Sequence, residues 1–194
     1  MKMSLFHKRA QLIGAALLLC NSAAPTLAAD AVELTASRTA AGELLKVLKG
    51  DMEKALQSGG PINAIHFCNE NAQKLTQEVA AKHGVDVRRT SLRIRNPKNQ
   101  PDAWETAVLK AFDERHAAGE AAKNLEHYEV VDANGTKTFR YMKAIPLFGP
   151  CYNCHGAVKP ELRSEITRLY PDDQAVGFEV GDVRGAFTVQ IPMK

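Results

Sequence analysis

The segment from Cys151 to His155 reads CYNCH and has the residue types and spacing of a covalent haem site. In a C-x-x-C-H motif, two thiols add to the vinyl groups on one edge of the porphyrin, and the adjacent histidine binds the iron. The pattern predicts one covalent haem c attached through Cys151 and Cys154, with His155 as an axial ligand. The flanking residues Pro150 and Gly156 predict a tight loop around the motif.

Other uses of paired cysteines compete with haem attachment. A structural zinc site needs a second close pair of Cys or His ligands, which the sequence lacks. A thioredoxin-like dithiol opens a helix within a βαβ unit, and the pattern around residue 151 does not indicate such a unit. A local disulfide between the two thiols stays open as an alternative. The histidine directly after the second cysteine favours haem.

The N-terminal segment resembles a secretory signal peptide. Basic residues precede the apolar run 12–19, which is too short to span a bilayer, and small residues follow it. We therefore expect a signal peptide at 1–28, a haem-binding domain at 29–194 and a periplasmic location. Export suits the motif, because haem is attached to such motifs outside the bacterial cytoplasm.

The charge of the domain excludes some classes of partner. The whole chain of 194 residues has a formal net charge of +3. Cleavage removes Lys2, Lys8 and Arg9, so the 25 basic residues less three leave 22, equal to the 22 acidic residues. A neutral domain gives no reason to expect nucleic acid or an anionic membrane as partner. No later apolar run predicts a membrane span after cleavage.

Cys68 is the one cysteine left over. Cys20 leaves with the signal peptide and the haem motif uses two thiols, so Cys68 has no partner in an oxidising compartment. It shares an apolar helical stripe with Ile65 and Ala72, which predicts that it points inward. We predict Cys68 as the second axial ligand of the iron. A small buried hydrophobe is the alternative use of a free cysteine.

Other side chains compete with Cys68 for this sixth position on the iron. Met142, in a predicted strand near the motif, is the next candidate, with core packing as its ordinary role. His116 is the candidate after Met142, and it lies on a predicted helix face that also carries Trp104. His66, His83 and His127 are predicted to be exposed.

Hydrophobic periodicity and turn formers predict helices first and antiparallel strands after them. The stripe of Leu44, Leu48, Met52 and Leu56 recurs every four residues and predicts a helix that stops at Ser58–Pro61. Asp102 is the expected N-cap of a later helix. The order of elements favours an α+β fold. The predicted helices are 40–57, 62–82 and 102–119, and the predicted strands are 85–92, 128–131, 136–145, 178–180 and 186–191.

The chain from Ala41 to Met193 resembles the Tll-type single-haem c-type proteins, long described only as a domain of unknown function. The resemblance rests on segments 64–68, 89–99, 150–156 and 181–187, which occur in the same order. It implies a PAS-like antiparallel β-sheet flanked by N-terminal helices. It also implies that the haem iron lies between His155 and Cys68.

The arginines between Arg88 and Arg95 allow two interpretations. They could reach the propionates of a haem through charge-assisted hydrogen bonds. Alternatively, they form a solvated charged surface.

The function predicted from these features is a periplasmic haem-based redox or gas sensor. CO or NO would bind to the iron, and the chain would report to a separate redox partner or signalling protein. An electron-transfer cytochrome is the alternative. A haem peroxidase-like enzyme ranks third, because His116 is its one loose candidate for an acid–base group, and we predict no catalytic residue.

Overall fold

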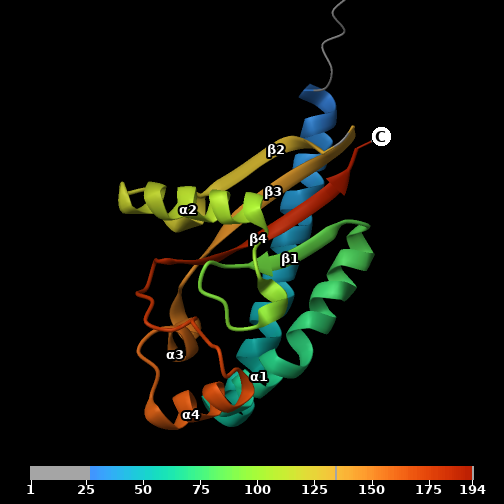
Figure 1. Ribbon diagram of the computed structural model, residues 1–194. Coiled ribbons are helices and arrows are strands. Elements are labelled where there is room, and N and C mark those ends of the chain that lie inside the picture. Colours follow the sequence, from blue (N-terminus) through green and yellow to red (C-terminus); the bar gives the residue numbers. More distant parts are fainter. Residues whose placement is uncertain (1–26, 134, 194) are drawn as a thin grey trace, which may run out of the picture.

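The computed structural model describes residues 27–133 and 135–193, and they form the predicted α+β arrangement (Figure 1). The predicted signal peptide, 1–28, lies outside the described residues except for its last two positions. Among the described residues, no helix combines the length and apolar character needed to cross a membrane. In chain order the elements are α1 (Leu27–His83), β1 (Asp86–Thr90), α2 (Ala103–Ala117), β2 (Glu126–Ala133), β3 (Thr136–Pro146), α3 (Tyr152–His155), α4 (Pro160–Leu169) and β4 (Val183–Pro192).

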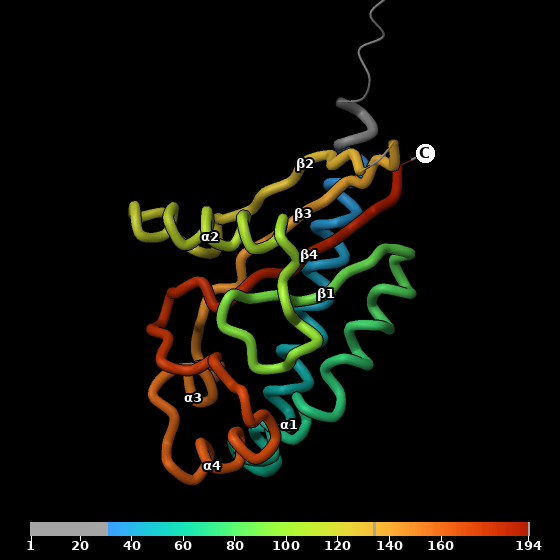
Figure 2. The backbone as a smooth tube through the Cα atoms, in the orientation of Figure 1, coloured from blue at the N-terminus to red at the C-terminus, as the bar shows by residue number. Residues whose placement is uncertain are grey.

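α1 consists of two helical arms joined by a kink at Gly59 and Gly60, whose backbone is not helical. Gly60 has φ 70° and ψ −169°, a combination that is open essentially only to glycine. Pro61 begins the second arm, where a missing backbone N–H costs nothing. The chain turns back at this point, and the second arm returns towards β1 (Figure 2). The predicted stop between the two helices is confirmed.

The first arm of α1 begins at Leu27, so the predicted start near Ala40 is wrong. Ser37 and Ala40 are fully buried, and Ala40 packs against the sheet. Small side chains at these positions let the helix approach the sheet closely. A pattern based on large aliphatic residues missed this part of the helix, because its buried stripe is built from small ones.

The four strands form one antiparallel sheet in the order β1-β4-β3-β2. Its register pairs Arg89 with Phe187 and Tyr141 with Val189. The predicted hairpin joins β2 to β3, and its turn is closed by a 2.9 Å hydrogen bond from the backbone N–H of Gly135 to Asp132 Oδ1.

Helices cover both faces of the sheet, as Figure 1 shows. The face towards α1 carries Val87, Phe139, Tyr141 and Val189, which pack with Leu44 and other α1 side chains. The opposite face packs against α2. The side chains of that second cluster include Leu109, Phe112, Met142, Ala144 and Ala186. Because neighbouring residues of β3 and β4 point to opposite faces, each strand contributes to both cores.

α2 begins at the predicted N-cap. The Asp102 carboxylate accepts a 2.8 Å hydrogen bond from the backbone N–H of Glu105, and Glu105 accepts one from the backbone N–H of Asp102. This reciprocal capping box satisfies two donors at the helix start. Glu105 is fully buried and also lies 2.6 Å from Arg88 Nη2, an ion pair that ties α2 to β1.

Two further parts of the chain differ from the sequence-based expectation. Residues 178–180 form no strand, because the backbone N–H of Phe178 bonds to the carbonyl of His155 rather than to a neighbouring strand. The helix α4 was not predicted. Its signals are Pro160 in the first turn and the buried pair Leu162 and Ile166, four residues apart.

Candidate functional site

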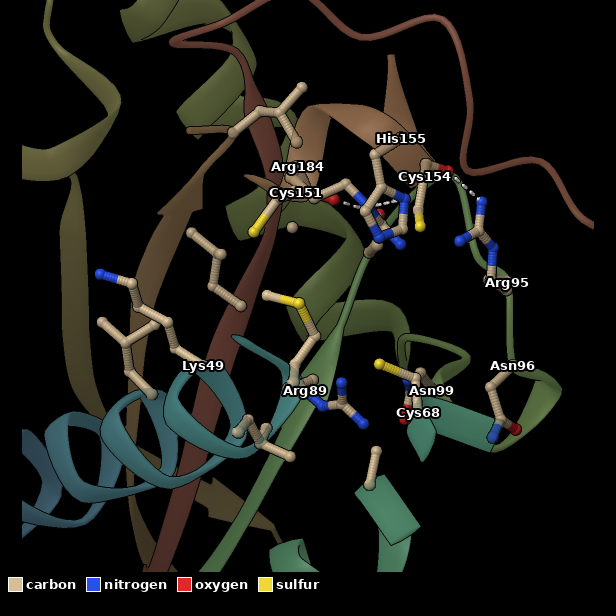
Figure 3. Close-up of a pocket in the computed structure, with 18 of the residues that line it drawn as sticks. Lys49, Cys68, Arg89, Arg95, Asn96, Asn99, Cys151, Cys154, His155 and Arg184 are labelled. Atoms are coloured by element: carbon tan, nitrogen blue, oxygen red, sulfur yellow. Dashed lines mark hydrogen bonds between the residues drawn. The ribbon is translucent and has the colours of Figure 1, made fainter. Parts of the chain in front are cut away.

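A single pocket brings the four predicted haem-site residues together (Figure 3). We call it the cysteine pocket. Cys151, Cys154 and His155 form one wall, and Cys68 lies across from them on the second arm of α1. Other lining residues come from the first arm of α1, from β1 and the segment after it, and from the start of β4.

The C-x-x-C-H motif lies on a short helical turn after β3. A 3-10 turn at Gly149–Cys151 continues directly into α3, so the predicted tight loop is a compact helical turn. The backbone N–H of Gly156 bonds to the carbonyl of Tyr152 at 2.8 Å and ends the turn. A Cβ atom on Gly156 would lie only 2.2 Å from the Tyr152 ring, so this position requires glycine.

The His155 imidazole is held through Nδ1, which lies 2.7 Å from the carbonyl oxygen of Ala175. Arg184 Nε lies 3.1 Å from the same nitrogen. Nδ1 can donate to the carbonyl or accept from Arg184, but not both. The contact with the carbonyl is the shorter one, and a carbonyl can only accept, so we assign the proton to Nδ1, which leaves the Nε2 lone pair free. Burial lowers the pKa of His155 well below its ordinary value, and the nearby cations Arg184 and Arg95 lower it further. A neutral imidazole with a free Nε2 is the form that binds metals.

Arg95 fastens the motif to the loop that follows α4. Its Nη2 donates to the carbonyl of Cys154 at 2.6 Å and to the carbonyl of Ala175 at 3.2 Å. Its Nε donates to Asp173 at 3.0 Å, and both side chains of this ion pair are buried. Arg95 therefore positions both Cys154 and the carbonyl that orients His155.

The three thiols of the cysteine pocket are protonated at neutral pH. Burial raises the pKa of Cys68, although Arg89 and Arg95 oppose the shift. Burial also raises the pKa of Cys151, and it raises that of Cys154 to about 11. Each thiol is therefore neutral. Its sulfur becomes a strong nucleophile or metal ligand only as the thiolate, after the proton is lost.

The wall of the pocket carries an excess of positive charge. Arg89 is enclosed by protein and faces the pocket, and within the described residues its buried Nε has no hydrogen-bond partner. Burial lowers the pKa of Arg184 to about 9, and repulsion by Arg95 and Arg89 adds to this effect. Arg95 is balanced by Asp173, whereas Arg89 has no comparable carboxylate partner among the ion pairs of the described residues.

The arginines between Arg88 and Arg95 do not form one solvated surface. Arg89 and Arg95 line the cysteine pocket, whereas Arg88 pairs with Glu105, and Arg93 stacks on the Phe178 ring at 4.0 Å. Arg184 was not singled out from the sequence, because a lone arginine at a strand start carries no local signal.

The competing ligand candidates lie elsewhere. Met142 is fully buried among the side chains under α2 and does not line the cysteine pocket, and His116 faces Asp182 from the end of α2. Neither residue therefore lies where the structure brings Cys68 and the C-x-x-C-H motif together. His66, His83 and His127 pair with Glu165, Glu43 and Glu129 and also lie outside the pocket.

The sequence did not single out Met52 as a site residue. Met52 and Leu48, which share the apolar stripe of the first predicted helix, both line the cysteine pocket. Met52 belongs to none of the four buried hydrophobic clusters formed by the described residues.

Comparison with known proteins places the chain in a family. The family model described as Tll0287-like matches residues 21–192. No curated protein matches the chain. Among solved structures, the crystal structure of the cyanobacterial heme-protein Tll0287 is similar, with a TM-score of 0.58 and 26% sequence identity, covering 84% of this chain and 94% of that one. The chain belongs to the Tll0287-like family.

Proposed function

We propose that this chain is a periplasmic single-haem c-type cytochrome that acts as a redox or gas sensor. Cys151 and Cys154 would hold the haem covalently, and His155 and Cys68 would be the axial ligands of its iron. The observation that carries the proposal is the position of Cys68, an unpaired thiol that faces the C-x-x-C-H motif across one pocket. The similarity to a cyanobacterial heme-protein supports the choice of cofactor.

The donor set of the cysteine pocket fits a haem. Two neutral thiols lie three residues apart on one helical turn, as addition to two vinyl groups requires, and His155 presents a free Nε2 beside them. Arg89 and Arg184 offer positive charge to the two propionates, and the buried unpaired Nε of Arg89 is a donor that such an anion would satisfy. The rest of the lining is largely apolar, as haem binding favours.

The PAS-like description of the fold is also part of the proposal. The first and last strands of the sheet, β1 and β4, are neighbours, and helices pack on both faces. This arrangement is compatible with a PAS-like sheet. Such a sheet would hold the cofactor beside its edge strand β1 and the second arm of α1.

When bound, the haem supplies a one-electron Fe(III)/Fe(II) couple and, in its ferrous state, a site for CO or NO. The Cys68 thiolate carries a negative charge, so it stabilises the ferric state and lowers the reduction potential by about 59 mV for each ~1.4 kcal/mol of preference. On reduction, Cys68 would gain affinity for a proton and lose affinity for the iron. Its departure would open the binding position opposite His155.

The first test compares the ferric absorption spectra of the purified haem-loaded protein and its Cys68→Ser variant. We expect red-region thiolate-to-iron charge-transfer bands in the wild type and none in the variant. Cys151→Ala is the matched control: it removes one thioether link, which shifts the pyridine haemochrome band, but leaves the charge-transfer bands. Identical ferric spectra for wild type and Cys68→Ser would show that Cys68 is not a ligand.

The second test separates a sensor from an electron carrier. Dithionite-reduced protein is titrated with CO, and its absorption is followed. A sensor loses Cys68 ligation on reduction and binds CO, whereas a carrier keeps its ligands in both oxidation states and takes up CO slowly or not at all.

A third result would overturn the proposed haem function altogether. That result is a protein without covalent haem after expression in a host that attaches haem to C-x-x-C-H motifs.

A further inference from the structure

Met52 lines the cysteine pocket from the first arm of α1. Leu45, Leu48 and Lys49 line the same pocket, and with Met52 they occupy one face of that helix at spacings of three and four residues. Met52 is partly exposed, and it does not pack into a buried cluster of the described residues. The Met52 side chain therefore belongs to the lining of the cysteine pocket rather than to a hydrophobic core.

The other described methionines have different surroundings. Met142 is fully buried under α2, and Met193 packs against the cluster between α1 and the sheet. Neither lines the cysteine pocket. Among the described residues, Met52 is thus the methionine placed to deliver a thioether to a group held in this pocket.

We propose that Met52 replaces Cys68 as the axial ligand opposite His155 when the iron is reduced. The proposal rests on the function proposed above and deepens it. One electron arrives from an external one-electron reductant. Cys68 would then leave, with both electrons of the iron–sulfur bond staying on its sulfur, and would take one proton from a solvent hydronium ion, releasing a water molecule, to become a thiol. Met52 supplies a lone pair from its sulfur for the new bond, so no other atom is gained or lost.

The chemistry of the two sulfur groups favours this exchange. A thiolate is an anion and stabilises the ferric state, whereas a thioether is neutral and soft, and methionine ligation raises the reduction potential of haem proteins. A pocket that holds both groups can offer each oxidation state the ligand it prefers.

The two sulfur groups reach the pocket from the two arms of α1. Met52 lies on the arm before Gly59 and Gly60, and Cys68 lies on the arm after them. The two sulfur atoms therefore approach the pocket from different arms of α1.

The test compares haem-loaded wild type with Met52→Leu, and uses Met142→Leu as the matched control. Leucine keeps the volume and apolar character of methionine and removes only the sulfur donor. Absorption spectra are recorded in the ferric and the dithionite-reduced states, and CO affinity is measured on the reduced proteins. Equal haem content and equal far-UV circular dichroism establish that the variants are folded.

We expect all three ferric spectra to be the same. Reduced wild type and Met142→Leu should be six-coordinate and low-spin, whereas reduced Met52→Leu should be five-coordinate and high-spin. If Met52 occupies the iron in about nine of ten reduced molecules, its loss makes the apparent CO affinity about tenfold tighter.

Reduced spectra and CO affinities that are the same in Met52→Leu and wild type would overturn this inference, even if the ferric bands still depended on Cys68. The proposed function fails through a different result, namely ferric bands that do not depend on Cys68. The two failures are therefore read from different oxidation states and different variants.

Discussion

Glu126 at the start of β2 is held by two partners from other elements. Arg38, on the first arm of α1, forms an ion pair with its carboxylate, and the Tyr141 hydroxyl donates to Glu126 Oε2 at 3.1 Å. The hydrogen bond from Arg38 is the main cause that lowers the pKa of Glu126 from its ordinary value of 4.5, and the bond from Tyr141 adds to it. The carboxylate is therefore a charged link between α1 and the hairpin.

The link predicts a pH-dependent contribution to stability. A lowered folded-state pKa stabilises the protein above the unfolded pKa near 4.5, and this contribution is lost as the pH falls through the folded pKa. Glu126→Gln keeps an acceptor for Tyr141 but loses the charge. We expect it to lower the free energy of unfolding at pH 7 by less than about 1 kcal/mol, because Arg38 is half exposed and solvent screens the pair.

Urea denaturation of wild type and Glu126→Gln between pH 7 and pH 3 checks this prediction. The difference between the two proteins should shrink below about pH 4.5. Glu70→Gln, at an exposed position of α1, serves as the control and should change little at any pH. A constant offset across the whole pH range would show that the charge is not the cause.

At the scale of elements, the kink in α1 positions both arms that line the cysteine pocket. Gly60 adopts φ 70° and ψ −169°, which an alanine reaches only with strain. Gly60→Ala should therefore reduce the free energy of unfolding by about 1–3 kcal/mol. Urea denaturation followed by circular dichroism measures this loss.

Gly42 provides the matched substitution within α1. It lies in the helical first arm, and a Cβ there meets no atom within 4 Å. Gly42→Ala should raise the free energy of unfolding by about 0.5–1 kcal/mol, because alanine loses less backbone entropy in a helix than glycine does. Equal effects of the two substitutions on the free energy of unfolding would mean that the backbone conformation of the kink does not require glycine at position 60.

At the scale of the whole molecule, the two main cores cannot separate, because they share the sheet. β3 places Phe139 and Tyr141 on the α1 side and Met142 and Ala144 on the α2 side. Removing either helix layer would expose one face of the same strands. We therefore expect residues 29–194 to unfold as a single cooperative unit.

Two probes report on different layers and test this expectation. Trp104 fluorescence follows the α2 layer, whereas far-UV circular dichroism is dominated by the long α1. Their urea transitions should coincide in midpoint and slope. Separate midpoints would show that the α2 layer and the α1 layer form independent units.

Much of the fold was predictable from the sequence because its signals are local. Gly59, Gly60 and Pro61 end one helix and begin another through their own backbone preferences. Asp102 and Glu105 cap α2 across only three residues. The C-x-x-C-H motif can also be recognised from its residue types and their spacing alone. Such features depend on neighbours in the chain, so reading the chain is enough to find them.

Other features of the site were decided by the tertiary structure. Met142 lies in a predicted strand and Met52 on the apolar stripe of a predicted helix, yet the first is enclosed under α2 and the second lines the cysteine pocket. The carbonyl of Ala175 and the guanidinium of Arg184 meet His155 only after distant segments come together. Composition and periodicity predict which residues are buried or turned inward, but only long-range packing decides which cavity they face. The sequence by itself thus determined the motif, the caps and the helix break, whereas the folded chain decided which sulfur atoms and cations surround that motif.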